Sequence, residues 1–220
     1  MTETPTKPET KTKRILTVEI EYDQDLECPI GESGDTKERF VSFNRRHKAY
    51  ADPSEWIAGL NRHGEVIFTP EGFGLRRQLE TGTAFILSYF EHGSSVWSLQ
   101  GAGPQCQWDT ADVAGIYWLP SDVPKDRRRE YAKAAMESYT DWCNGNGYGY
   151  TITDQATGEM LDSCWGFIGD KHASDSILEA IQNVAGGSDF EVIWAGDAKG
   201  LAEYGKLGRL TEYEDPEDDD

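Results

Sequence analysis

Residues 147–172 constrain the fold of this chain more than any other segment. Residues 149–154 alternate between apolar and polar side chains, which is typical of a half-buried strand, and residues 160–167 form a second run rich in apolar and aromatic residues. Turn-forming residues separate the two runs. This arrangement predicts a β-hairpin, and the residues from Asp170 onward predict a helix directly after it.

The same kind of pattern predicts strands on both sides of the hairpin. Residues 14–22 alternate most clearly, with Leu16, Val18 and Ile20 on one face and Glu19 and Glu21 on the other. Shorter apolar runs predict further strands at residues 40–43, 84–90, 96–99, 113–119 and 190–194. Residues 65–68 fit either a strand or part of a long loop.

Apolar side chains at helical spacing predict two principal helices. One covers residues 125–144 with Tyr131, Ala135, Tyr139 and Trp142 as its apolar face, and the other covers about residues 174–184 with Ile177, Leu178, Ile181 and Val184 as its stripe. A short helix is expected over residues 52–59, because Asp52 can cap it and Pro53 suits its first turn. The glycine-rich residues 70–82 carry no predicted element.

These elements predict an α+β fold, in which a largely antiparallel sheet packs with the two principal helices. We expect a single α+β domain over residues 14–197. Residues 1–13 are rich in Thr, Pro, Lys and Glu and predict a disordered arm. Residues 198–220 are expected to form a glycine-containing segment that ends in an acidic tail.

The charge of the chain limits its partners. It carries 40 acidic and 21 basic residues, a formal net charge of −19, and stays at −12 when the tail is left out. Such a surface repels phosphate backbones and anionic membranes, so we expect neither direct nucleic-acid binding nor membrane binding, but a basic partner. The tail acids are the expected partner-binding residues: Glu212, Glu214, Asp215, Glu217, Asp218, Asp219 and Asp220.

Few patterns in the sequence point to catalysis. CxxC, HExxH and a complete phosphate loop do not occur, so no metal and no cofactor is expected. Cys164 precedes His172 by eight residues, but it is interpreted as a small core side chain. The basic clusters at residues 45–48 and 127–129 could bind an anion or pair with neighbouring acids. The four cysteines are widely spaced and the N-terminus lacks an export signal, which predicts reduced thiols and a cytoplasmic location.

Four segments occur in a characteristic order: FVSFNRRH (residues 40–47), CQWDTADVAGIYWL (106–119), YGYTITD (148–154) and LDSCWGFIGD (161–170). Together they resemble a family of uncharacterised proteins carried by bacteriophages and other mobile elements. In that family the helix before Tyr-Gly-Tyr is acidic, whereas here it begins with three arginines. The resemblance implies an accessory protein that acts in a bacterial cytoplasm, and it implies no catalytic residue.

The main expectation is therefore a non-enzymatic inhibitor of a host defence complex, such as a CRISPR or restriction complex. It would bind a basic nucleic-acid site through its acidic surface and thereby mimic DNA. One alternative is an enzyme or small-ligand binding protein with a pocket beside the hairpin, formed by Asp109, Asp162, Cys164 and His172. Another alternative is a structural or assembly factor of a phage.

Overall fold

The computed structural model describes residues 13–30, 38–203 and 207. It confirms the α+β class with largely antiparallel sheets. The chain divides into two compact units, and the expected single domain over residues 14–197 is thus split. Unit 1 comprises Met1–Leu26 and Gly145–Asp220, and unit 2 comprises Glu27–Asn144. Except for Lys13, the predicted N-terminal arm lies outside the described residues.

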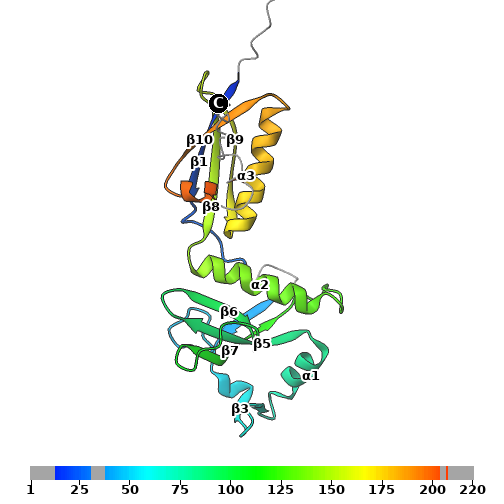
Figure 1. The fold of residues 1–220 in the computed structure, drawn as a ribbon. Coiled ribbons are helices and arrows are strands. Elements are labelled where there is room, and N and C mark those ends of the chain that lie inside the picture. The colour runs from blue at the N-terminus through cyan, green and yellow to red at the C-terminus, as the bar shows by residue number, and fades with distance from the viewer. Residues whose placement is uncertain (1–12, 31–37, 204–206, 208–220) are drawn as a thin grey trace, which may run out of the picture. The chain divides into compact units, whose positions relative to one another are not determined.

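Unit 1 is built on the predicted hairpin (Figure 1). Its four-stranded sheet has the order β10-β1-β8-β9, in which β8 is antiparallel to β1 and β9, and β10 is parallel to β1. Its elements are β1 (Arg14–Tyr22), β8 (Gly147–Asp154), β9 (Met160–Ile168), α3 (Asp170–Ala185), β10 (Phe190–Ala195) and the 3₁₀ helix η3 (Lys199–Glu203).

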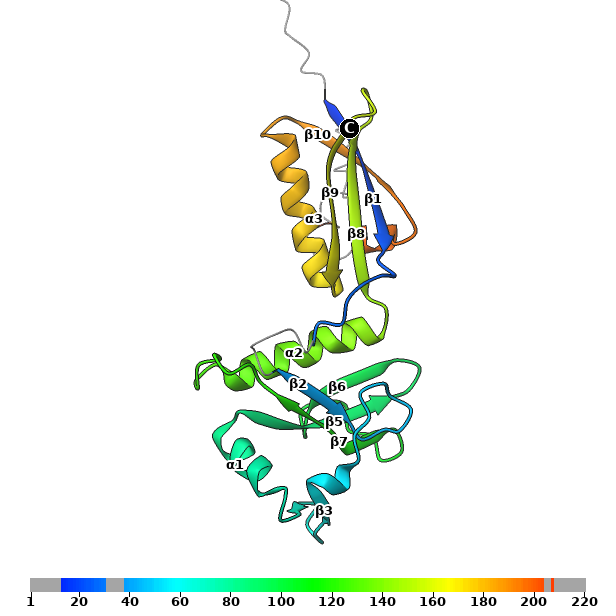
Figure 2. The same ribbon diagram turned by 180° about the vertical axis from the view of Figure 1, so that it is seen from behind.

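The apolar face of β1 forms the core of unit 1. Leu16, Val18 and Ile20 are fully buried, and they belong to one cluster with Ile177 and Ile181 of α3. Helix α3 therefore covers one face of the sheet, as Figure 2 shows. The opposite face carries the alternate β1 side chains, including the exposed Glu19 and Glu21. The predicted alternation of β1 and the predicted stripe of α3 are confirmed at these positions.

Unit 2 contains a four-stranded antiparallel sheet of order β2-β7-β5-β6 and a separate β3-β4 hairpin. One face of the sheet packs against α2, and the other face against a smaller cluster that includes Leu75 and Ile116. Its elements are β2 (Arg39–Ser42), η2 (Pro53–Glu55), β3 (Ile57–Leu60), β4 (Val66–Phe68), α1 (Phe73–Thr81), β5 (Ala84–Glu91), β6 (Ser95–Leu99), β7 (Thr110–Trp118) and α2 (Arg128–Cys143).

The local predictions for residues 52–82 were partly wrong. Asp52 does cap a turn, because its carboxylate accepts a 3.0 Å hydrogen bond from the backbone N–H of Ser54. The turn stops after three residues, since the next residues pair with β4 and form β3 instead of a helix. Residues 70–82, for which no element was predicted, contain α1.

The predicted apolar face of α2 is rotated by one position. Ala132 and Met136 are its buried residues, whereas 41% of Tyr131 is exposed. Ala135 and Tyr139 pack partly buried against the same cluster. The aromatic side chains suggested one face, but the small side chain at 132 allows the helix to approach the sheet closely.

Candidate functional site

The acidity of the chain is concentrated in unit 1. Its described residues include 14 acidic and 4 basic side chains, a formal net charge of −10. The described residues of unit 2 include 15 acidic and 12 basic side chains, a net charge of −3. Unit 1 therefore has the more negative electrostatic potential of the two units, and this potential would attract a partner with a basic surface.

An acidic side chain occurs at every second residue from Glu19 to Asp25. Glu19 and Glu21 lie on the sheet face opposite α3, and residues two apart on one strand are roughly 6.8 Å apart. The ladder neighbours of Glu19 are Thr151 and Ala195, and Glu21 lies opposite Gly149. These neighbours are small and uncharged, and among the described residues neither carboxylate forms a salt bridge. The sequence already shows this alternation, but it was the tail acids, not these residues, that were predicted to bind a partner.

Several acids of unit 1 stabilise the fold through hydrogen bonds. Asp23 accepts bonds from the backbone N–H groups of Gly166 and Asp25. Asp162 accepts a 2.9 Å bond from the Tyr150 hydroxyl, and burial, together with this bond, raises the pKa of Tyr150. These carboxylates therefore also have a role within the fold.

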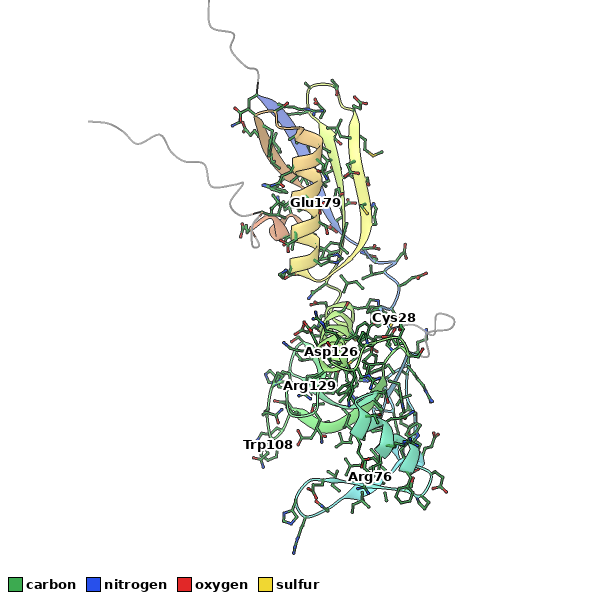
Figure 3. All side chains as sticks on the ribbon, turned by 90° about the vertical axis from the view of Figure 1, so that its right-hand side faces the viewer. Cys28, Arg76, Trp108, Asp126, Arg129 and Glu179 are labelled. Carbon is green, nitrogen blue, oxygen red and sulfur yellow. The ribbon has the colours of Figure 1, made fainter. Side chains whose placement is uncertain are left out.

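Ion pairs neutralise only a small part of the charge. Three of the 14 acids form a salt bridge to a described base, and the pairs are Lys13–Glu191 at 3.8 Å, Arg14–Asp154 at 2.7 Å and Lys171–Asp175 at 3.1 Å. The other acids of the described part of unit 1 have no salt bridge to a described base. The exposed ones are Glu19, Glu21, Asp25, Glu159, Glu179, Asp189, Asp197 and Glu203. Figure 3 shows Glu179 on α3, so the acids are not confined to the open sheet face.

The partner-binding residues predicted from sequence lie in the tail. Glu212, Glu214, Asp215, Glu217, Asp218, Asp219 and Asp220 are all outside the described residues. The acidic surface that the structure describes is therefore the body of unit 1.

Three residues of the alternative site belong to unit 1, and among its described contacts no hydrogen bond joins any two of them. Asp162 is bonded to Tyr150, and the ring of His172 packs edge-on against Phe167 with the centroids 5.6 Å apart. Asp109 belongs to unit 2, where its carboxylate lies 3.3 Å from both Cys106 Sγ and His92 Nδ1. Nucleophilic catalysis needs a base within hydrogen-bonding reach, and no described contact joins Cys164 to His172.

The interpretation of Cys164 as a core side chain was wrong. Cys164 is exposed, and so is Trp165, because β9 is the edge strand of its sheet. A Cβ placed on Gly149 would lie 2.1 Å from the Trp165 ring. The Trp165 ring thus lies over this glycine of the neighbouring strand.

The basic cluster at the start of α2 serves the fold of unit 2. Arg127 forms a 2.7 Å ion pair with Glu130, and Arg128 donates a 2.8 Å hydrogen bond to the carbonyl of Thr81 at the end of α1. In the other cluster, the ring of His47 shares a 2.9 Å hydrogen bond with Ser42. The sequence left open whether these clusters bind an anion or pair with neighbouring acids. Pairing with a neighbouring acid is confirmed at Arg127.

Two features are absent from the part of the chain that the structure describes. Its His, Cys, Asp and Glu side chains form no group of three or more that could hold a metal ion. None of its helices is both long enough and apolar enough to cross a membrane. Comparisons of the chain with models of protein families, with curated proteins and with solved structures find no match.

Proposed function

We propose that the protein is a non-enzymatic inhibitor that binds a basic nucleic-acid site on a host defence complex through the acidic surface of unit 1. The observation that carries this proposal is the excess of 14 acids over 4 bases in the described part of that unit. We place the protein in the bacterial host cytoplasm, as an accessory protein of a bacteriophage or another mobile element. A CRISPR or restriction complex fits the proposal, because each presents a basic groove to DNA.

Electrostatics explains why such a surface suits this role. A groove that binds nucleic acid is lined by Lys and Arg, and the exposed carboxylates of Glu19, Glu21 and Asp25 offer it negative charge on β1 and the turn after it. The field of unit 1 also accelerates the encounter with a basic partner. Ions screen exposed charges over about 8 Å at physiological salt, so binding of this kind weakens as salt rises.

The proposal is tested in two steps. The tagged full-length protein is first incubated with bacterial lysate at low salt, and proteins eluted by a salt gradient are identified by mass spectrometry. The purified partner is then mixed with its labelled nucleic acid, and fluorescence anisotropy measures displacement by the inhibitor. We expect competition with the nucleic acid and a loss of affinity of at least about tenfold between 50 and 200 mM salt.

Matched variants locate the surface. The triple variant Glu19→Gln, Glu21→Gln, Asp25→Asn removes three charges from unit 1, and we expect it to weaken competition at least about tenfold. The control Glu71→Gln, Asp112→Asn, Asp122→Asn removes three exposed charges from unit 2 and should compete like the unchanged protein. A third variant, truncated after Thr211, measures the contribution of the acidic tail.

Three results would overturn the proposal. One is the absence of any salt-dependent partner, and another is a partner that still binds its nucleic acid when saturated with this protein. The third is an unchanged affinity in both the unit 1 triple variant and the truncated variant.

A further inference from the structure

Unit 2 contains a cavity that the proposed function does not use. Its volume is about 1030 Å³, which is enough for a drug-sized organic molecule. Its walls come from β2 and the segments before and after it, the end of β5, the start of β6 and the C-terminal part of α2. All its lining residues belong to unit 2, so the cavity is a property of that unit alone.

Aromatic rings form the floor of this cavity. Phe40 and Trp97 come from the two edge strands of the sheet, and their ring centroids are 5.0 Å apart, so their side chains meet across its face. Tyr139 of α2 approaches Phe40 at 4.6 Å and stacks on Trp142 at 5.7 Å. Tyr89 completes the row at 4.6 Å from Trp97.

Two acidic and two basic side chains border the rings, and one of the basic side chains is directed to the other face of the sheet. Glu38 and Glu91 line the cavity, and Glu38 accepts a hydrogen bond from the buried Tyr117 hydroxyl. Lys48 is the basic side chain that opposes them. Arg39 also borders the cavity, but its guanidinium lies 5.0 Å from the centroid of Trp118, on the opposite face of the sheet.

The remaining polar groups of the lining are neutral near pH 7. Burial lowers the pKa of His47, and its Nδ1 is engaged by Ser42 at 2.9 Å, so the ring is an uncharged partner for a ligand. Burial raises the pKa of the Cys143 thiol to about 11 and also raises that of Cys28. Neither thiol therefore adds charge or supplies a reactive thiolate.

We propose that this cavity binds a flat organic cation, such as a positively charged aromatic heterocycle. Trp, Tyr and Phe rings attract a cation through their π faces, and they also bury the apolar body of a planar ligand. The carboxylates of Glu38 and Glu91 add selectivity for positive charge. An anionic ligand such as a nucleotide would meet two like charges, against which Lys48 supplies one opposite charge, so its affinity should be lower than that of the cation.

The probe is 1-methylquinolinium, and its uncharged isostere 1-methylnaphthalene serves as the reference. Isothermal titration calorimetry with the full-length protein measures both affinities and the stoichiometry. We expect one site per chain that prefers the cation at least tenfold. Glu91→Gln should weaken cation binding at least threefold and leave 1-methylnaphthalene unaffected.

Two controls separate this site from the acidic surface. Glu137→Gln removes an exposed charge on α2 outside the cavity lining, and the unit 1 triple variant removes three charges from the other unit. Both should bind 1-methylquinolinium like the unchanged protein. Equal affinity for the two probes, no binding of the cation at millimolar concentration, or an equal loss in the Glu137→Gln control would each overturn the proposal.

The result does not depend on the proposed inhibitory function. Competition with nucleic acid is read from the partner, whereas probe binding is read from the isolated protein. Because Glu38 is bonded to Tyr117, a Glu38→Gln variant is compared with the unchanged protein by thermal unfolding before titration. If that variant does not fold, Glu91→Gln alone decides the outcome.

Discussion

The Nε of Arg14 donates a 2.7 Å hydrogen bond to the carboxylate of Asp154, which joins the first residue of β1 to the last residue of β8. The same guanidinium donates a 3.0 Å bond to the carbonyl of Val184 near the end of α3. The carboxylate in turn accepts bonds from the backbone N–H groups of Ala156 and Thr157 in the hairpin loop. One ion pair thus ties the sheet, the loop and the helix of unit 1 together.

This pair predicts a pH-dependent loss of stability in Asp154→Asn. The bond from Arg14 is the main reason that the pKa of Asp154 lies below its usual value. A carboxylate with a lowered folded-state pKa stabilises the fold above its unfolded pKa of about 3.9 and loses that contribution as pH falls through the folded value. We expect the variant to be less stable in urea at pH 7, and the difference to shrink below pH 4. A difference that is constant from pH 7 to pH 3 would contradict the assignment.

Two glycines predict opposite effects of the same substitution. A Cβ on Gly115 in β7 would lie 2.3 Å from the backbone carbonyl oxygen of Val41, so Gly115→Ala should destabilise the protein by about 1–3 kcal/mol. Gly74 in α1 has open space around it, and Gly74→Ala should stabilise the helix by about 0.5–1 kcal/mol. Urea denaturation measures both values, and each variant serves as the control for the other. A stabilised Gly115→Ala variant would show that β2 and β7 are farther apart than described.

The raised pKa of Cys143 predicts slow alkylation. The residue is exposed, but partial burial of its thiol raises the pKa to about 11, so little thiolate is present at pH 8. We expect its rate of reaction with iodoacetamide to rise about tenfold per pH unit between pH 8 and 10. Peptide mapping by mass spectrometry measures the rate, with the exposed Cys164 as the internal reference. A Cys143 rate that levels off below pH 9 would contradict the prediction.

The insertion of unit 2 predicts that unit 1 folds without it. The chain leaves unit 1 after Leu26 and returns at Gly145, and a Cβ on the nearby Gly147 would lie 2.7 Å from the Leu26 side chain. The two ends are close, and the core of unit 1 contains residues of that unit alone. We expect a chain in which Gly-Ser-Gly replaces residues 27–144 to unfold cooperatively. Circular dichroism during heating tests this, and the absence of a cooperative transition would show that unit 1 depends on unit 2.

The local patterns of the sequence predicted much of unit 1 correctly. The alternation of β1, the hairpin of β8 and β9 and the stripe of α3 are confirmed, because each pattern reports burial within one continuous segment. Unit 2 was harder to predict. Its helix α1 begins in a glycine-rich segment, and the expected helix at residues 52–59 gave way to the pairing of β3 with β4.

The partner-binding residues stay a prediction. Composition alone predicts an acidic protein with a basic partner, because the net charge can be counted without knowledge of the fold. The selected tail acids lie outside the described residues, whereas Glu19 and Glu21 form part of the acidic surface only because β1 turns that side away from α3. Cys164 was placed in the core from its neighbours in sequence, but the edge position of β9 exposes it.

The sequence by itself determined the fold class, the negative charge and the strands and helices whose side chains alternate with a clear period. Only the tertiary structure decided that residues 27–144 form a separate unit and that Phe40 and Trp97 share a cavity. Net charge is a sum over residues, and periodicity is a repeat within one continuous segment. Both therefore follow from the sequence without any knowledge of the fold. The division into units and the cavity depend instead on pairings between distant strands, such as β1 with β8 and β2 with β7, which no single segment specifies.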